Sequence, residues 1–207
     1  MTPAPTSYVQ LLDPAREDPV DARILDAALE LFAEIGVSRV GIDDIARRAK
    51  INRATVYRRI GAKDTIVRAA VLRETARFLD RIAARLRVID DAHQRIIDGF
   101  ALTLTELRAH PILRKILTVD REYTLATITV DAAGSLALAT QFVAHEILAV
   151  RPGHHHDSTI DATAAMIVRL IHSLVLIPDA PPQLRTQADL RDFAAGHLVP
   201  LVGPATL

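Results

Sequence analysis

The residues best suited to bind another molecule lie in one short segment, between Asn52 and Ile60. Val56 and Ile60 are four residues apart, which places both on one face of a helix. The opposite face then carries hydrogen-bond donors and small apolar groups: Arg53, Ala54, Thr55, Tyr57 and Arg58. Arginine binds guanine edges and phosphates, and small apolar groups contact thymine methyls. The segment therefore has the side chains that a helix needs in a DNA major groove.

A second short helix and a tight turn would position this segment. From Gly41 to Ala49, apolar residues recur at the spacing of one helical face, with acidic residues at the N-terminal end and basic residues at the C-terminal end. Lys50 and Ile51 form the turn, and Asn52 can cap the helix that follows. Residues 41–60 therefore predict two helices joined by a turn.

The positive charge of the chain is concentrated around this helix pair. Between Arg39 and Lys63 there are 8 basic and 2 acidic residues, whereas the whole chain has 25 of each. A local excess of positive charge in a neutral protein suits a phosphate backbone. A solvated helical face would give the same pattern, so the charge supports DNA binding only together with the turn and the outward side chains.

Composition limits the class of protein. The 207 residues are 50% apolar, which is enough for a small domain attached to a larger one. The absence of cysteine excludes disulfides and cysteine-based catalysis or metal binding. The N-terminus lacks the pattern of a secretory signal, and the uncharged apolar stretches are shorter than the roughly 18–20 residues that span a bilayer. We expect a cytoplasmic protein that does not enter a membrane.

The remainder of the chain predicts an all-α fold. Residues 1–17 are rich in proline and polar residues and are expected to form a flexible arm. Asp18 can cap a helix that has Pro19 at its first position and ends at Gly36. Later helices are predicted at residues 62–86, 91–109, 112–128, 134–150, 159–177 and 187–202. Only residues 124–130 could alternatively form a strand, and that strand would have no other strand to pair with.

Three stretches of the sequence, ILDAALELFAEIG, DDIARRA and RATVYRRIGAKD, resemble the N-terminal domain of the tetracycline-repressor (TetR) family of bacterial transcription regulators. The resemblance covers residues 18–78. It implies a helix-turn-helix DNA-binding domain at 18–66 and a larger domain for ligand binding and dimerisation at 67–207.

The resemblance also implies roles for individual residues. The recognition helix would insert in the major groove, so that Arg53, Ala54, Thr55, Tyr57 and Arg58 meet bases and phosphates. Lys63 would hold a phosphate with help from the N-terminus of its helix. Gly41 stands where the family usually has a hydroxyl residue, so its backbone N–H would contact phosphate. Lys50 stands where the turn usually has a small residue, and it would either strain the turn or add a phosphate contact.

For the larger domain, the resemblance implies a homodimer and a ligand cavity. Helices 159–177 and 187–202 would form the dimer interface, although they could also be core helices of a monomer. The central helices would enclose a site for a small, largely apolar effector that releases the protein from a pseudo-palindromic DNA operator. The residues expected around it are Phe100, Leu104, Leu107, Ile116, Arg121, Tyr123, Gln141, Phe142 and His145.

No group of residues predicts catalysis, a cofactor or a metal site. His145 and Glu146 start like the zinc protease pattern, but the second histidine is replaced by Ala149. The histidines at 154–156 are adjacent in a loop and would point in different directions, which favours a solvated loop. The alternatives to a ligand-released repressor are a helical enzyme acting on small molecules and a DNA binder without an effector.

Overall fold

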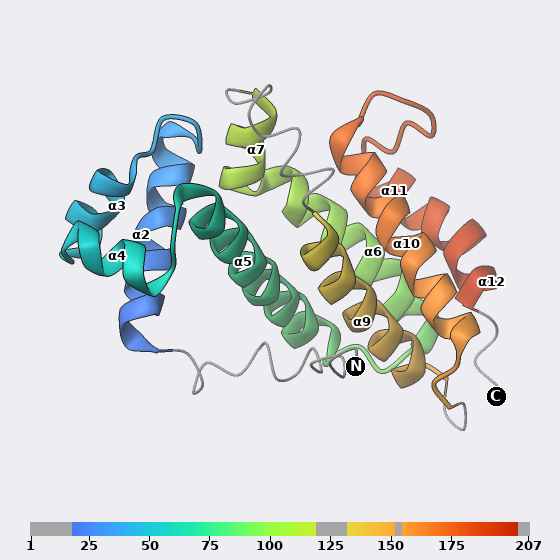
Figure 1. Ribbon diagram of the computed structural model, residues 1–207. Coiled ribbons are helices and arrows are strands. Elements are labelled where there is room, and N and C mark those ends of the chain that lie inside the picture. Colours follow the sequence, from blue (N-terminus) through green and yellow to red (C-terminus); the bar gives the residue numbers. More distant parts are fainter. Residues whose placement is uncertain (1–17, 119–131, 152–154, 203–207) are drawn as a thin grey trace. The chain divides into compact units, whose positions relative to one another are not determined.

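The computed structural model describes residues 18–118, 132–151 and 155–202, and every regular element in these ranges is a helix (Figure 1). The predicted all-α fold is therefore confirmed. The later part of the helix expected at 112–128, and the whole of the strand alternative at 124–130, lie outside the described residues.

Two compact units divide the chain. Among the described residues, the first unit comprises 18–77 together with 110–118 and 132–135, and the second unit comprises the rest. The first unit is thus assembled from separate stretches of the chain.

Helix α2 (Pro19–Ile35) begins and ends where the sequence predicts. The Asp18 side chain accepts a hydrogen bond of 2.8 Å from the N–H of Val20, and a proline at the first helical position loses no intrahelical hydrogen bond. Gly36 ends the helix with a φ of 92°, a conformation that glycine adopts without steric cost.

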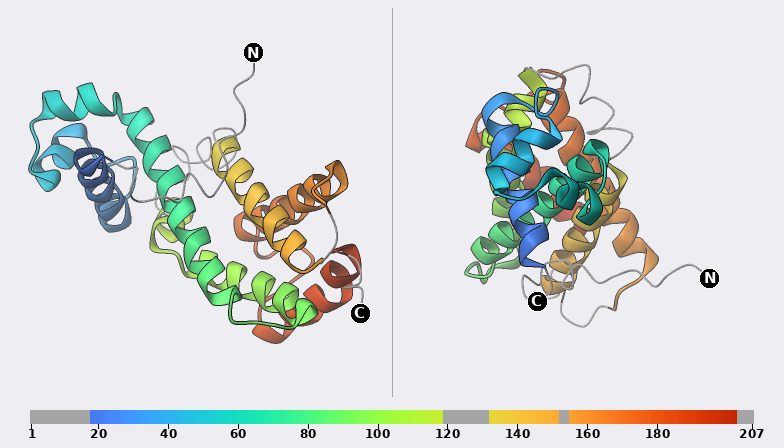
Figure 2. Two further views of the ribbon diagram at one scale, coloured as in Figure 1. Left: turned by 90° about the horizontal axis from the view of Figure 1, so that it is seen from below. Right: turned by 60° about the vertical axis from the view of Figure 1, so that its left-hand side comes forward.

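Helices α3 (Ile42–Ala49) and α4 (Arg53–Arg59) form the expected helix-turn-helix (Figure 2). The side chain of Asn52 caps α4 by accepting a hydrogen bond of 2.8 Å from the N–H of Ala54. Lys50 lies in the left-handed region, with a φ of 54° and a ψ of 46°. That conformation is unfavourable for a residue with a Cβ atom, so the turn is strained at Lys50.

One hydrophobic core holds the first unit together, and five helices contribute to it. Two of these helices are α5 (Lys63–Leu86) and α7 (Pro111–Thr118), of which α7 comes from the separate stretch of chain. The buried residues of this core include Ile24, Phe32, Ile45, Val56, Ile66, Ile112 and Ile116. Figure 2 shows α5 as one unbroken helix.

The second unit is a bundle in which α6 (Ala92–Ala109) contacts four of the other helical segments. Helices α9 (Ala133–Ala149) and α10 (Ser158–Leu176) follow α7 in the described chain (Figure 1). The helix expected at 187–202 is divided by a π-helical turn. Its parts are α11 (Gln187–Phe193), the π-helix η2 (Ala194–Leu198) and α12 (Val199–Val202).

Helix α10 has the length and composition of a membrane span, with 19 residues and a mean hydropathy of 1.5. It is longer than the uncharged apolar stretches of the sequence because it includes two charged residues, Asp161 and Arg169. Ile160, Ala164 and Leu174 are buried inside the second unit, so α10 serves as a core helix of the bundle.

Candidate nucleic-acid interface and effector cavity

Helix α4 packs on the first unit through one fully buried residue, Val56. The Arg53 side chain is 66% exposed and Tyr57 is 59% exposed. Ala54 and Arg58 are also exposed, and Thr55 is half-buried. The outward face that the sequence predicts is therefore present, and its contact with DNA stays a prediction.

Two exposed arginines of the helix pair form ion pairs with acidic residues of α3. Arg53 donates from Nη1 to both carboxylate oxygens of Asp43, at 2.9 and 3.1 Å. Arg47 donates to Asp44 at 3.1 Å. Exposed pairs of this kind contribute about 0–1 kcal/mol because water screens them. A phosphate or a guanine edge can therefore replace these carboxylates at little cost.

Two of the basic residues counted in the sequence hold α3 and α4 onto α2 instead. Arg48 donates to Glu34 at 2.8 and 2.9 Å and to Glu30 at 3.1 Å. Arg59 donates to Asp21 at 2.7 Å. Hydrogen bonds to Glu34 and to Asp21, respectively, raise the pKa of the two guanidinium groups. Fewer basic side chains are therefore available to bind phosphate than the 8 counted between Arg39 and Lys63.

Gly41 and Lys63 already have partners within the first unit. The N–H of Gly41 donates to Asp44 Oδ2 at 3.0 Å, so a phosphate at this N–H would have to displace a carboxylate. Lys63 Nζ donates to the carbonyl oxygen of Ser38 at 2.9 Å. This bond holds the ammonium at the N-terminus of α5, where the helix dipole also favours an anion.

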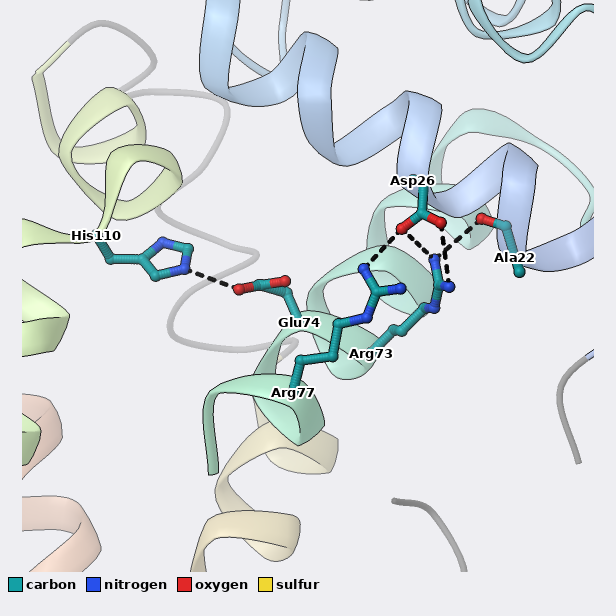
Figure 3. Close-up of polar contacts among 6 residues, drawn as sticks. All are labelled: Ala22, Asp26, Arg73, Glu74, Arg77 and His110. Carbon is teal, nitrogen blue, oxygen red and sulfur yellow. Dashed lines mark hydrogen bonds and ion pairs between the residues drawn. The ribbon is translucent and has the colours of Figure 1, made fainter. Parts of the chain in front are cut away.

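Polar contacts attach the middle of α5 to two neighbouring elements (Figure 3). Arg73 and Arg77 both donate to Asp26 of α2, at 2.8 and 2.6 Å. Glu74 and His110, the residue before α7, lie 3.0 Å apart between Oε1 and Nε2. Figure 3 shows that Arg73 and Arg77 extend from α5 toward α2, whereas Glu74 extends in another direction, toward His110. The same part of α5 is therefore connected both to α2 and to the start of α7.

The contacts of Asp26 predict a pH dependence of stability. Burial raises the pKa of Asp26, but hydrogen bonds from Arg77 and Arg73 outweigh burial and hold the pKa below its ordinary value of 3.8. A carboxyl whose pKa is lowered by folding stabilises the protein above its unfolded pKa, and this contribution disappears as pH falls through the folded pKa. After allowance for solvent screening, Asp26→Asn should lower the free energy of unfolding by about 1 kcal/mol at pH 7.

Urea unfolding at a series of pH values checks this prediction. The difference in the free energy of unfolding between Asp26→Asn and wild type should narrow below about pH 4 and vanish at pH values below the folded pKa. A difference that stays constant down to pH 3 would show that the ion pairs do not cause it.

The second unit contains a cavity of about 80 Å³. One water needs about 10–15 Å³ of such space, so the cavity is larger than a single water site. Phe100 and Phe142, both predicted as ligand contacts, line it. Arg95 and Glu146 are its charged residues, and they form an ion pair of 2.7 Å between Nη2 and Oε2.

Sequence reasoning missed Arg95 and Glu146. It selected His145 from α9, but His145 is exposed, whereas its neighbour Glu146 faces the cavity. A signal was present, because Glu146 is the one residue of Asp, Glu, Lys or Arg type in α9. Ile116, also predicted as a ligand contact, packs in the core of the first unit because α7 belongs to that unit.

The other predicted ligand contacts do not line this cavity. Leu104 is buried, and Leu107 and Gln141 are half-buried, in α6 and α9 of the second unit. Arg121 and Tyr123 lie outside the described residues.

The described residues contain no group of three or more His, Asp or Glu side chains that could hold a metal ion. His155 and His156 of the histidine run are exposed, and His156 pairs with Asp161 at 2.8 Å. His154 lies outside the described residues.

Comparison with known proteins identifies the family. A family model described as "Bacterial regulatory proteins, tetR family" matches residues 24–70, which include the helix-turn-helix. The chain is 33% identical over 153 residues to the HTH-type transcriptional repressor Rv3405c of Mycobacterium tuberculosis, with 69% of this chain and 80% of that protein covered.

Solved structures share the fold. The TetR family repressor AlkX from Dietzia sp. strain DQ12-45-1b, implicated in biodegradation of n-alkanes, superposes with a TM-score of 0.67 at 22% identity, covering 86% of this chain and 95% of that one. FadR from Bacillus subtilis in complex with stearoyl-CoA gives 0.51 at 20% identity, covering 88% and 98%. Together with the relative that is 33% identical, these matches show that the chain belongs to the tetR family of helix-turn-helix transcriptional regulators, which bind DNA and are not enzymes.

Proposed function

We propose that the protein is a cytoplasmic repressor that binds a pseudo-palindromic operator as a homodimer and leaves the operator when a small, largely apolar molecule binds the second unit. The observation that carries the proposal is the outward face of α4. Buried Val56, the Asn52 cap and the Arg59–Asp21 pair hold this helix, and Arg53, Ala54, Tyr57 and Arg58 are left exposed to a groove. The relative Rv3405c, described as a repressor, supports the direction of regulation.

The side chains of α4 suit a major groove in different ways. Arg53 can form two hydrogen bonds to a guanine edge, and Ala54 can contact a thymine methyl. Tyr57 and Arg58 can donate to bases or phosphates. Two copies of α4 in a dimer would read half-sites about 34–36 Å apart, or a multiple of that distance.

Exposed apolar and small residues of the second unit support a dimer. On α10, Met166 is 51% exposed, and on α12, Leu201 is 41% exposed. A Cβ atom added at Gly196 of η2 would meet no heavy atom within 4 Å, so this backbone is open to close approach. We propose that a second copy of the chain covers these surfaces of 159–177 and 187–202.

The cavity of the second unit supports an effector. Its walls are mainly apolar, and the Arg95–Glu146 pair supplies charged groups. A bound effector would lower operator affinity if it favoured the spacing of the two α4 helices that does not fit the operator. A DNA binder without an effector would have no use for this cavity, which is why the ligand-released repressor is preferred.

Selection of duplexes from a randomised library by the full-length protein tests the DNA-binding part of the proposal. The expected result is an enriched sequence with inverted half-sites. Gel filtration with light scattering at micromolar concentration should give twice the mass of the 22.6 kDa chain. A protein that enriches no sequence, or that elutes as a monomer, would contradict the proposal.

Lys63→Ala should weaken binding to all duplexes alike. A phosphate contact carries no base information, so the selected sequence should not change. The slope of log K against log salt should become shallower by about 1 for each subunit. Fluorescence anisotropy over a salt series measures both effects. Arg185→Ala, which removes an exposed charge from the loop before α11, is the matched control and should change neither.

A further inference from the structure

The cavity of the second unit has a charged pair in a wall that, apart from Thr103, is otherwise apolar. Arg95 comes from α6 and Glu146 from α9, and their side chains are only 18% and 15% exposed. Arg95 donates from Nη2 at 2.7 Å and from Nε at 3.1 Å, and both bonds end on Oε2 of Glu146. The two charges cancel, and Oε1 takes neither of these hydrogen bonds.

This pairing decides which charge a ligand can carry. A ligand carboxylate that bound Arg95 would have to displace Glu146 or lie beside it. Either arrangement leaves a carboxylate without its partner in a largely buried site, which is costly. A ligand ammonium that bound Glu146 would in the same way leave a positive charge, its own or that of Arg95, without its partner. An uncharged ligand leaves the ion pair intact and carries no such cost.

The pair still offers hydrogen bonds to an uncharged polar group. A guanidinium has five N–H donors, of which two go to Glu146, and a carboxylate has two acceptor oxygens. A hydroxyl group of a ligand can accept a hydrogen bond from the guanidinium and donate one to the carboxylate at the same time. The neighbouring walls, including Ile96, Val143 and Ile171, suit an apolar body.

We infer that the cavity binds an uncharged alcohol: a short apolar chain or ring whose hydroxyl lies at the Arg95–Glu146 pair. This inference rests on the proposed function in that it names the class of effector for the proposed cavity. It assigns Arg95 and Glu146 as the residues that select against charged ligands.

Three probes with the same chain length test the inference: 1-hexanol, hexanoate and hexylamine. Binding to the full-length protein is measured by titration calorimetry at pH 7 without DNA. The expected result is a dissociation constant for 1-hexanol at least tenfold below those of the other two. A wild-type protein that binds hexanoate or hexylamine as tightly as 1-hexanol, or that binds none of the three, would overturn the inference.

Two variants reverse the charge preference if the pair is responsible. Glu146→Gln leaves the positive charge of Arg95 without a counter-charge, so hexanoate should gain at least tenfold and become the preferred probe. Arg95→Gln should favour hexylamine in the same way. The double variant Arg95→Gln with Glu146→Gln contains no charge and should again prefer 1-hexanol, which keeps the test valid if one single variant folds poorly.

Glu106→Gln is the matched control. Glu106 forms an ion pair with Arg85 in the same unit and does not line the cavity, so the order of the probes should stay as in wild type. If Glu106→Gln changed the order as Glu146→Gln does, the effect would come from net charge, and the assignment to the cavity pair would be wrong.

Operator selection is a separate measurement that distinguishes the two proposals. A protein that binds its operator but fails the probe test refutes this inference alone. A protein that selects no duplex refutes the proposed function.

Discussion

Arg53→Ala is expected to lower affinity for the selected operator by about 1–3 kcal/mol per half-site and to relax the base preference at one position of each half-site. Arg53 is the first residue of α4, and its side chain is two-thirds exposed beside Asp43. Because a guanidinium matches the two acceptors of a guanine edge, its removal should cost sequence information as well as affinity. Selection from a randomised library with the variant measures the loss of base preference, and anisotropy titration measures the loss of affinity.

Arg47→Ala is the matched control for Arg53→Ala. Arg47 has a 76% exposed side chain on α3 and, like Arg53, pairs with an acidic residue of that helix. Its removal takes away the same charge from the same unit but should leave the selected sequence unchanged. If Arg53→Ala weakened all duplexes equally, Arg53 would be a phosphate contact, and the base-reading role would be wrong.

Met166→Glu is expected to convert the dimer into a monomer and to lower operator affinity by about 100-fold or more. The Met166 side chain is half exposed on α10, so a glutamate there does not disturb the core of one subunit. In the proposed dimer the new charge would be buried against the second copy without a partner, which is strongly unfavourable. A monomer would then hold one half-site only, and each loss of about 1.4 kcal/mol is a tenfold loss of affinity.

Light scattering at micromolar concentration and operator titration measure the two effects of Met166→Glu. Val88→Glu is the control, because Val88 is an equally apolar residue that is 81% exposed in the turn after α5. It should leave both the mass and the affinity unchanged. A dimeric Met166→Glu variant with wild-type affinity would place the interface elsewhere.

The features that the sequence predicted well depend on short-range chemistry. The caps of α2 and α4 join residues two positions apart, and the position of Val56 follows from the period of one helix. The family could also be identified from the residue types of these helices. The features that were missed depend on contacts between distant residues. Arg59 and Asp21 are 38 positions apart, and Arg95 and Glu146 are 51 apart.

Periodicity alone therefore did not separate a basic side chain that holds two helices together from one that faces solvent. It also did not indicate that the helix at 187–202 contains a π-helical turn, since the pattern of apolar residues continues through Ala194 and Leu198. The DNA contacts, the dimer interface and the effector remain predictions, because each needs a second molecule.

The place of α7 in the first unit has a consequence for how the chain folds during synthesis. Ribosomes release the N-terminal part first, at about 5–20 residues per second. Residues 18–77 emerge well before Ile112 and Ile116, which complete the same core. For several seconds the nascent helix-turn-helix unit therefore exposes the apolar surface that α7 will cover, and all of α6 must leave the ribosome before that surface closes. A fragment that stops at residue 77 would keep this surface exposed permanently, so it should aggregate more readily than a fragment extended through Thr118.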